Sequence, residues 1–199
     1  MIQARFSKRL GAFNLQAVME DSGFILLSGR NGAGKSTFLL CLLGKHPIDS
    51  GSIFVNGRDV TVLPVEKRHM AFVNASTCFP HMDVVKHLSW GAKDVKPGKS
   101  VMDDIRSRLG ITFEGRVGRL SLGQRIRVSL ATAILSNPEV LLIDEAMSNL
   151  SEKDRIISEM VSISKESHFD TVYVSQDPSE KSGIEHNYLL EEGRMTKIF

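Results

Sequence analysis

The fold is decided by one glycine-rich stretch, Gly29-Arg30-Asn31-Gly32-Ala33-Gly34-Lys35-Ser36-Thr37. An apolar run of strand length, 24–28, precedes it, and an apolar run without a breaker, 38–43, follows it. Strand, glycine-rich loop and helix in this order are typical of a phosphate-binding loop, because glycine lets backbone N–H groups turn inward around phosphate oxygens. Lys35 is expected to reach the β- and γ-phosphates, and the Ser36 hydroxyl to ligate Mg2+. The sequence therefore predicts a nucleotide site at this loop.

A second chemical signal follows another apolar run. Residues 140–143 lack any polar alternation, as expected of a strand that is buried on both faces, and Asp144 and Glu145 come directly after them. Ligands of parallel sheets bind at the carboxyl ends of the strands, so both acids are expected near the phosphate-binding loop. Asp144 is suited to hold the Mg2+ shell through water, and Glu145 to polarise a water for attack on the γ-phosphate.

Composition describes an ordinary globular chain and argues against several classes of protein. With 199 residues, 42% of them hydrophobic, the chain has room for one sizeable domain. A formal charge of +2 gives no basic footprint for nucleic acid. Cys41 and Cys78 stand far apart, which favours a reduced, cytosolic protein. Lys8 and Arg9 interrupt the segment where a signal peptide would be apolar, and no apolar run approaches the ~20 residues of a membrane span. Any membrane role is expected to depend on a partner.

The remaining patterns alternate strands with helices, which indicates a mostly parallel sheet covered by helices. Strands are expected at 2–6, 13–19, 52–56, 70–74 and 170–175, and a terminal hairpin at 188–199 that turns at Glu192-Gly193. Helices are expected at 35–43, ended by Gly44, and at 152–165. From 83 to 136 the periodicity is helical. An inserted helical segment is therefore expected between two sheet-forming halves.

A third motif, Leu120-Ser121-Leu122-Gly123-Gln124, matches the L-S-G-G-Q signature of ATP-binding cassette (ABC) ATPases except at Leu122. It lies shortly before the acidic strand, as in that family. With all three motifs in this order, nearly the whole chain resembles an ABC transporter ATP-binding subunit. The stretch Phe79-Pro80-His81-Met82 resembles importer-type subunits, and Leu10-Gly11-Ala12-Phe13 resembles the subunits that power molybdate, tungstate or sulfate uptake.

The resemblance implies a single ABC ATPase domain over residues 1–199. Its fold would be an α/β P-loop NTPase, with a RecA-like core and an antiparallel β subdomain in 1–82 and 137–199. An α-helical subdomain that carries the signature would occupy 83–136. The family works as a head-to-tail dimer that encloses two ATP molecules. The implied partners are a second copy or a paralogous ABC subunit, and transmembrane permease subunits, with the protein cytoplasmic and peripheral on the inner face of the membrane.

The resemblance also assigns the site residues, with ATP and Mg2+ as cofactors. Nucleotide-binding positions are Gly29, Asn31, Gly32, Ala33, Gly34, Lys35, Ser36 and Thr37 of one copy, and Ser121, Gly123 and Gln124 of the other. Phe13 is expected to stack on adenine, with Leu10 and Phe6 as alternatives. Catalytic positions are Glu145, Gln176 and Asn74, and metal-binding positions are Ser36, Asp144 and Asn74.

Five positions depart from the family pattern. Asn74 or Ala75 stands where a glutamine senses Mg2+, Leu122 replaces the first signature glycine, Ala146 a proline, Ser151 an aspartate, and Gln176 the switch histidine. Glutamine can hydrogen-bond to a γ-phosphate but cannot carry a proton charge. Because Glu145 and Lys35 are intact, we expect a slow or conditional ATPase.

Three functions remain open at this stage. The leading one is the ATP-hydrolysing subunit of an ABC importer that energises solute uptake. A non-transport ABC switch ATPase is disfavoured, because no tandem cassette, coiled coil or zinc module is visible. A degenerate regulatory partner in a heterodimer is kept open by the departures. Around 74–90, either a groove receives a helix of the membrane subunit, or Phe79 and Met82 are simply buried.

Overall fold

Successive side chains of the central strands point to opposite faces of the sheet and divide the interior into two cores. In β3 (Phe24–Ser28), Phe24 and Leu26 face one core, whereas Ile25 and Leu27 face the other. β7 (Val140–Asp144) divides in the same way. Both faces are covered, which is why these strands read as continuous apolar runs. The computed structural model describes residues 1–95, 98–150, 152–176 and 183–199.

Ten strands form one sheet in the order β5-β4-β1-β2-β10-β9-β3-β8-β7-β6. Strands β9, β3, β8, β7 and β6 run parallel, whereas β1, β2, β4 and β5 pair antiparallel. The remaining strands are β1 (Ile2–Leu10), β2 (Phe13–Asp21), β4 (Ser50–Val55), β5 (Arg58–Asp59), β6 (Met70–Val73), β8 (Asp170–Ser175), β9 (His186–Glu191) and β10 (Arg194–Lys197).

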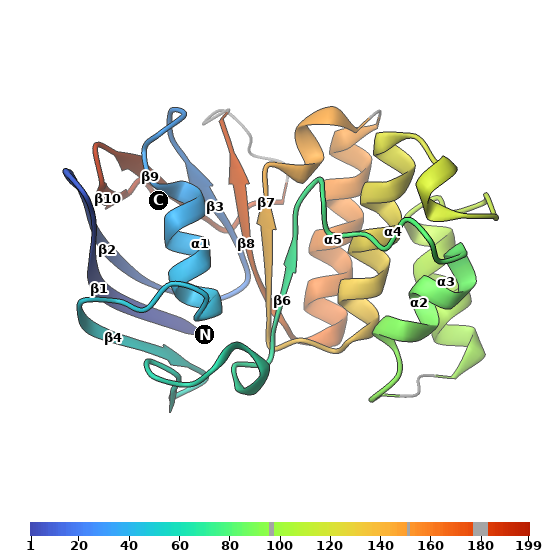
Figure 1. Ribbon diagram of the computed structural model, residues 1–199, viewed down its shortest axis with the longest axis horizontal. Coiled ribbons are helices and arrows are strands. Elements are labelled where there is room, and N and C mark those ends of the chain that lie inside the picture. The colour runs from blue at the N-terminus through green and yellow to red at the C-terminus, as the bar shows by residue number, and fades with distance from the viewer. Residues whose placement is uncertain (96–97, 151, 177–182) are drawn as a thin grey trace.

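Helices cover the two faces unequally (Figure 1). Helix α1 (Lys35–Leu43) packs against the parallel strands on one face, and β1, β2 and β4 curl around its other side. The opposite face carries α2 (Val84–Gly91), α3 (Lys99–Arg108), α4 (Leu122–Leu135) and α5 (Lys153–Ser167). Short 3-10 turns occupy Val65–Lys67, Val117–Arg119 and Ala146–Asn149. Within the described residues no helix has both the length and the apolar character to cross a bilayer.

The predicted α/β fold, its helices and its strands are confirmed, with shifts at the ends. The first two strands are longer than expected and pair from Ile2 to Asp21 in one register. The arm expected at 52–56 begins at Ser50, and its Asn56-Gly57 turn has positive φ at both residues, 50° and 76°. The helical stretch resolves into α2, α3 and α4.

Arg68 joins the end of α1 to the segment that follows β5, a role that the sequence alone does not predict. Its side chain is 3% exposed, and Nη1 donates to the carbonyls of Cys41 (3.1 Å) and Leu42 (2.8 Å) at the end of α1. Nε donates to Leu63 O and Nη2 to Thr61 O, each at 2.9 Å. A cation at a helix C-terminus satisfies carbonyls that have no intrahelical partner.

Replacing Arg68 by Met is therefore expected to destabilise the protein by about 2–4 kcal/mol, because two buried and two partly buried carbonyls lose a charged donor. Urea denaturation measures the loss. Lys165→Met is the control: its side chain is 60% exposed and pairs with Glu185, so the expected loss is below about 1 kcal/mol. Equal losses in the two variants would contradict the buried-cap role.

Candidate nucleotide-binding site

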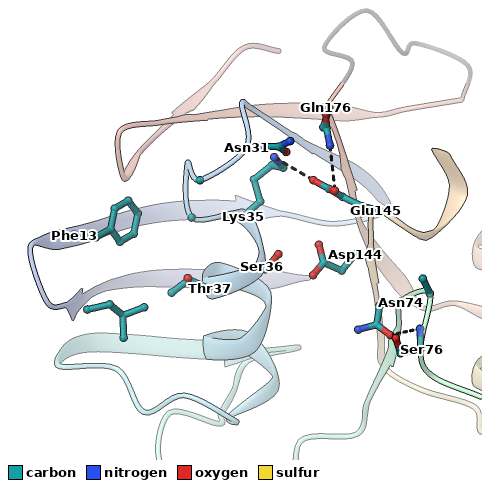
Figure 2. Close-up of a pocket in the computed structure, with 14 residues that line it drawn as sticks. Phe13, Asn31, Lys35, Ser36, Thr37, Asn74, Ser76, Asp144, Glu145 and Gln176 are labelled. Carbon is teal, nitrogen blue, oxygen red and sulfur yellow. Dashed lines mark hydrogen bonds and ion pairs between the residues drawn. The ribbon is translucent and has the colours of Figure 1, made fainter. Parts of the chain in front are cut away.

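One cavity of about 920 Å3 lies at the carboxyl ends of the parallel strands (Figure 2). It gathers residues far apart in the sequence: Leu10, Phe13, Asn31, Gly32, Gly34, Lys35, Ser36, Thr37, Asn74, Ala75, Ser76, Asp144, Glu145 and Gln176. Most of the residues assigned within one copy line it. Gly29 and Ala33 belong to the same loop but stand outside this lining.

The loop needs glycine at positions that the motif names. Gly29, Gly32 and Gly34 have φ of 147°, 80° and 105°, a region that L side chains rarely adopt. A Cβ on Gly29 would stand 2.2 Å from the carbonyl oxygen of Leu190. Gly34 is the N-cap of α1, so the loop ends where the helix N-terminus offers free N–H groups.

Lys35 connects the loop to the acidic strand. Its side chain is 4% exposed, and Nζ donates to the carbonyls of Gly29 (2.7 Å) and Arg30 (3.0 Å). The same nitrogen lies 3.4 Å from Glu145 Oε1. The ammonium is thus held at the boundary between the loop and β7, where it can also meet phosphate oxygens.

Asp144 carries a buried oxygen that lacks a partner. Among the described residues, its Oδ1 is one of three buried side-chain atoms with no hydrogen-bond partner. Burial raises the pKa of this carboxyl above its ordinary value; the Ser36 hydrogen bond and the Lys35 charge oppose the shift, whereas the Glu145 charge adds to it. A desolvated carboxylate beside a hydroxyl is a donor set that Mg2+ prefers, so Asp144 and Ser36 fit this ion.

Glu145 lies between two donors at the mouth of the cavity. Gln176 Nε2 donates to its Oε2 at 3.2 Å, whereas Lys35 lies nearest to its other oxygen, Oε1 (Figure 2). The backbone of Glu145 has φ of 49°, which turns the chain as it leaves β7. The structure therefore brings Gln176, the residue at the switch position, into contact with the proposed base.

Asn74 lines the cavity, but the oxygen of its side-chain amide already accepts a hydrogen bond. Oδ1 accepts a hydrogen bond from the backbone N–H of Ser76 at 2.8 Å, on the side away from Asp144 (Figure 2). Ser76 also lines the cavity. The sequence does not predict this role, since Asn74 and Ala75 are the residues that stand where the family has its glutamine.

The apolar end of the cavity is formed by the β1–β2 hairpin. Leu10 and Phe13 pair across it and both line the cavity. The Phe13 ring packs against the loop so closely that a Cβ on Gly34 would stand 2.6 Å from a ring carbon. The alternative prediction that Phe6 stacks on adenine is wrong. Phe6 is 4% exposed and stacks on Phe38 in the core, with ring centroids 5.7 Å apart.

The signature residues form the start of α4, and none of the three assigned ones lines this cavity. Ser121 Oγ accepts from Gln124 N at 3.3 Å, and Gln124 Oε1 accepts from Ser121 N at 2.9 Å. This capping box uses the Gln124 side chain to begin the helix. The Ser121 hydroxyl proton remains available to a further acceptor, because the oxygen only accepts in this bond. Of the five positions that depart from the family pattern, Ser151 lies outside the part of the chain that the structure describes.

A glycine-rich loop, a buried lysine and an acid pair around one cavity define a P-loop nucleoside triphosphatase. The ABC transporter family model matches residues 13–148. The chain belongs to this family and is one of its ATP-binding domains.

Relatives and solved structures agree with this assignment. The molybdate/tungstate import ATP-binding protein WtpC of Archaeoglobus fulgidus is 30% identical over 213 residues, covering 100% of this chain and 89% of the relative. The sulfate/thiosulfate import ATP-binding protein CysA of Nephroselmis olivacea is 32% identical, covering 96% of this chain but only 60% of its own length. The solved structure of cbiO1 from Clostridium perfringens covers 98% of this chain and 86% of its own, with a TM-score of 0.82 at 21% identity, which supports the fold.

Asp144→Asn is expected to raise the thermal stability of the nucleotide-free protein. A carboxyl whose folded pKa is raised stabilises the fold at low pH and loses that contribution as the pH rises through the folded value, so at neutral pH the ionised form is a cost. Each kcal/mol recovered corresponds to about 2–4 °C in the melting temperature for a chain of this size.

Thermal melts at pH 7, with and without Mg2+, measure this effect. Any stabilisation by Mg2+ in the wild type should be absent from the Asn variant. Glu145→Gln is the matched control, since its side chain is 38% exposed and no comparable rise is expected. A melting temperature for Asp144→Asn below that of the wild type would contradict the view that the buried Asp144 carboxylate destabilises the nucleotide-free protein.

Proposed function

We propose that this chain is the ATP-hydrolysing subunit of an ABC importer. The observation that carries the proposal is the meeting of Lys35, Asp144 and Glu145 at one cavity. Lys35 begins α1, Asp144 ends β7, and Glu145 follows β7 directly. Import ATP-binding proteins among the relatives support the direction of transport. The solute would be selected by other subunits.

The residues of the cavity divide the chemistry among them. Backbone N–H groups of the loop and Lys35 would bind the β- and γ-phosphates, while Phe13 and Leu10 would support the base. Glu145 would accept a proton from the attacking water, and Gln176 would hold that carboxylate in position. Bound Mg2+ would supply charge neutralisation of the phosphates, held by Ser36 and Asp144 with Asn74 nearby.

A second copy, or a paralogous subunit, would complete each site. The described residues that line the cavity come from the phosphate-binding loop, the β1–β2 hairpin, the segment after β6, and the carboxyl ends of β7 and β8. We infer that one side of the bound phosphates is left for a partner to cover. The start of α4 offers Ser121 and Gly123 at a helix N-terminus, a position that attracts phosphate. ATP would thus join two copies head to tail.

A second cavity offers the place for a membrane partner. It has a volume of about 540 Å3 and is bounded by β6 and helices α2 and α4. Phe79 lines this cavity, whereas Met82 does not appear in its wall. Trp90, 46% exposed, also lines it, as expected of a surface that receives an apolar helix. We infer a cytoplasmic protein bound to permease subunits at the inner face of the membrane.

The division of the chain follows the same proposal. Residues 1–82 and 137–199 would act as the nucleotide-binding core, and 83–136 as the helical subdomain that presents the signature.

The second candidate function is a regulatory partner without useful turnover, which is favoured by the replacement of the switch histidine by Gln176. The Gln176–Glu145 contact argues for retained, slow hydrolysis.

Glu145→Gln is expected to trap an ATP-bound dimer. The amide keeps the size of the side chain but cannot accept a proton from water, so bound ATP persists and holds two copies together. Size-exclusion chromatography with light scattering in Mg-ATP measures the dimer. The double variant that also carries Lys35→Ala should stay monomeric. A monomer of Glu145→Gln at saturating Mg-ATP would count against the shared site.

Gln176→His is expected to raise the steady-state turnover several-fold. Imidazole can carry a proton charge near the γ-phosphate, whereas an amide cannot. The wild type is expected below about 1 s−1, an order of magnitude under the median enzyme. Phosphate release measures the rates, with Gln176→Asn as the control for a changed side chain. Wild-type turnover as high as that of the His variant would contradict a slow ATPase.

A further inference from the structure

One short segment forms a wall of both cavities. Asn74, Ala75 and Ser76 line the nucleotide cavity, and Ser76 to Phe79 line the second cavity. Ser76 therefore borders both. A shift of this segment would change the shape of each cavity at once.

Hydrogen bonds hold the segment at three points. At its start, Asn74 N donates to Thr77 Oγ1 at 3.0 Å, and Thr77 Oγ1 donates to Asn74 O at 2.9 Å. In the middle, Ser129 Oγ of α4 donates to Thr77 O at 2.9 Å. At its end, Phe79 N donates to His87 Nε2 of α2 at 3.1 Å.

His87 can make its contacts in one protonation state only. Thr132 Oγ1 donates its single proton to Val128 O at 2.8 Å, so at 2.7 Å it must accept from His87 Nδ1. The network thus assigns the ring proton to Nδ1 and leaves Nε2 bare to accept from Phe79 N–H. The ring is 1% exposed. Close approach of α2 to α4 at Gly91, where a Cβ would stand 2.3 Å from Thr132 O, fixes this geometry.

We propose that neutral His87 is a positioning residue for the segment 74–79, and that protonation of its ring releases Phe79 and loosens the wall shared by the two cavities. A proton on Nε2 would face the N–H of Phe79, donor against donor, and would place a charge in a buried site. The Phe79 ring packs on His87 (5.4 Å between centroids) and edge-on against Trp90 (4.8 Å), so both contacts would change together.

The surroundings of the His87 ring favour its neutral form. Burial lowers the pKa of His87 below its ordinary value of 6.5. Below that pH the unfolded chain binds the proton more readily than the folded one, so stability falls as the pH falls. The titratable or charged groups that line the same cavity are Cys78, Lys93 and Asp94, and His81 contacts the Phe79 ring from the exposed side. The lining residues of helix α4 are Ser129, Thr132 and Ala133, and its C-cap Ser136 also lines the cavity.

Trp90 is the only tryptophan of the chain, which makes its fluorescence a local reporter. Emission is measured from pH 8 to pH 4.5 for the wild type, His87→Gln and His81→Gln, with far-UV circular dichroism as a check on folding. Glutamine keeps an acceptor for Phe79 N–H but cannot be charged. We expect a reversible step below pH 6.5 in the wild type and in His81→Gln, and none in His87→Gln. A step that persists in His87→Gln, or no step in the wild type, would overturn the proposal.

A second readout tests the link to the nucleotide cavity and rests on the proposed function. The dissociation constant of a fluorescent ATP analogue is measured at pH 7.5 and pH 5.5 for the same proteins. Titration of the nucleotide phosphate affects all of them equally, so the comparison cancels it. We expect a several-fold greater weakening in the wild type than in His87→Gln. Equal weakening would overturn the link, whereas no binding by any variant at pH 7.5 would refute the proposed function and leave the fluorescence result to decide on His87.

Discussion

The close placement of Lys35 and the Asp144–Glu145 pair, at the same edge of the sheet, is the constraint on which the rest of the structure depends. A buried ammonium and a carboxylate with an unpaired oxygen are costly to remove from water, and they persist only where surrounding groups hold them. Here the carbonyls of Gly29 and Arg30 hold the lysine, and packing of β3, β8 and β7 between two apolar cores fixes the strand that carries the acids. In the proposed function this cost would be recovered when phosphates and a cation bind, which is the usual balance between stability and activity at a functional site.

Much of the fold could be predicted because the local signals were long and consistent. The apolar runs of β3 and β7 and the glycine loop follow directly from burial on both faces and from positive φ. Even the failure of Phe6 as a base-stacking residue is contained in the pattern, since Ile2, Ala4 and Phe6 alternate on the buried face of β1. Arg68, Ser76 and His87 could not be found in this way, because their roles arise from contacts between elements distant in the chain. The bond from Ser76 to the oxygen of Asn74 is equally invisible in the sequence.

The geometry explains how an incomplete site and a second cavity can belong to one mechanism. The phosphate-binding loop and the acids lie around one cavity, and the signature begins a helix outside the lining of that cavity. Among the described residues, a Cβ at Gly123 would meet Leu150 at an ordinary 3.5 Å and nothing closer, so these residues do not require glycine there. This points to an approaching partner as the reason for the small residue. The segment 74–79 borders both cavities, so under the proposed function it would link nucleotide binding to the surface proposed for the permease.

The central claim is that each nucleotide site is built from two copies, and mixing two disabled variants tests it most directly. Lys35→Ala removes the phosphate-binding lysine. Gly123→Asp places a side chain in the proposed partner surface, at a position where a Cβ would make an ordinary 3.5 Å contact with Leu150. Each variant alone should lose ATP hydrolysis. In the mixture, heterodimers contain one site with an intact loop from one chain and an intact signature from the other, so activity should return. Hydrolysis by the mixture no greater than the average of the two variants would contradict the shared site.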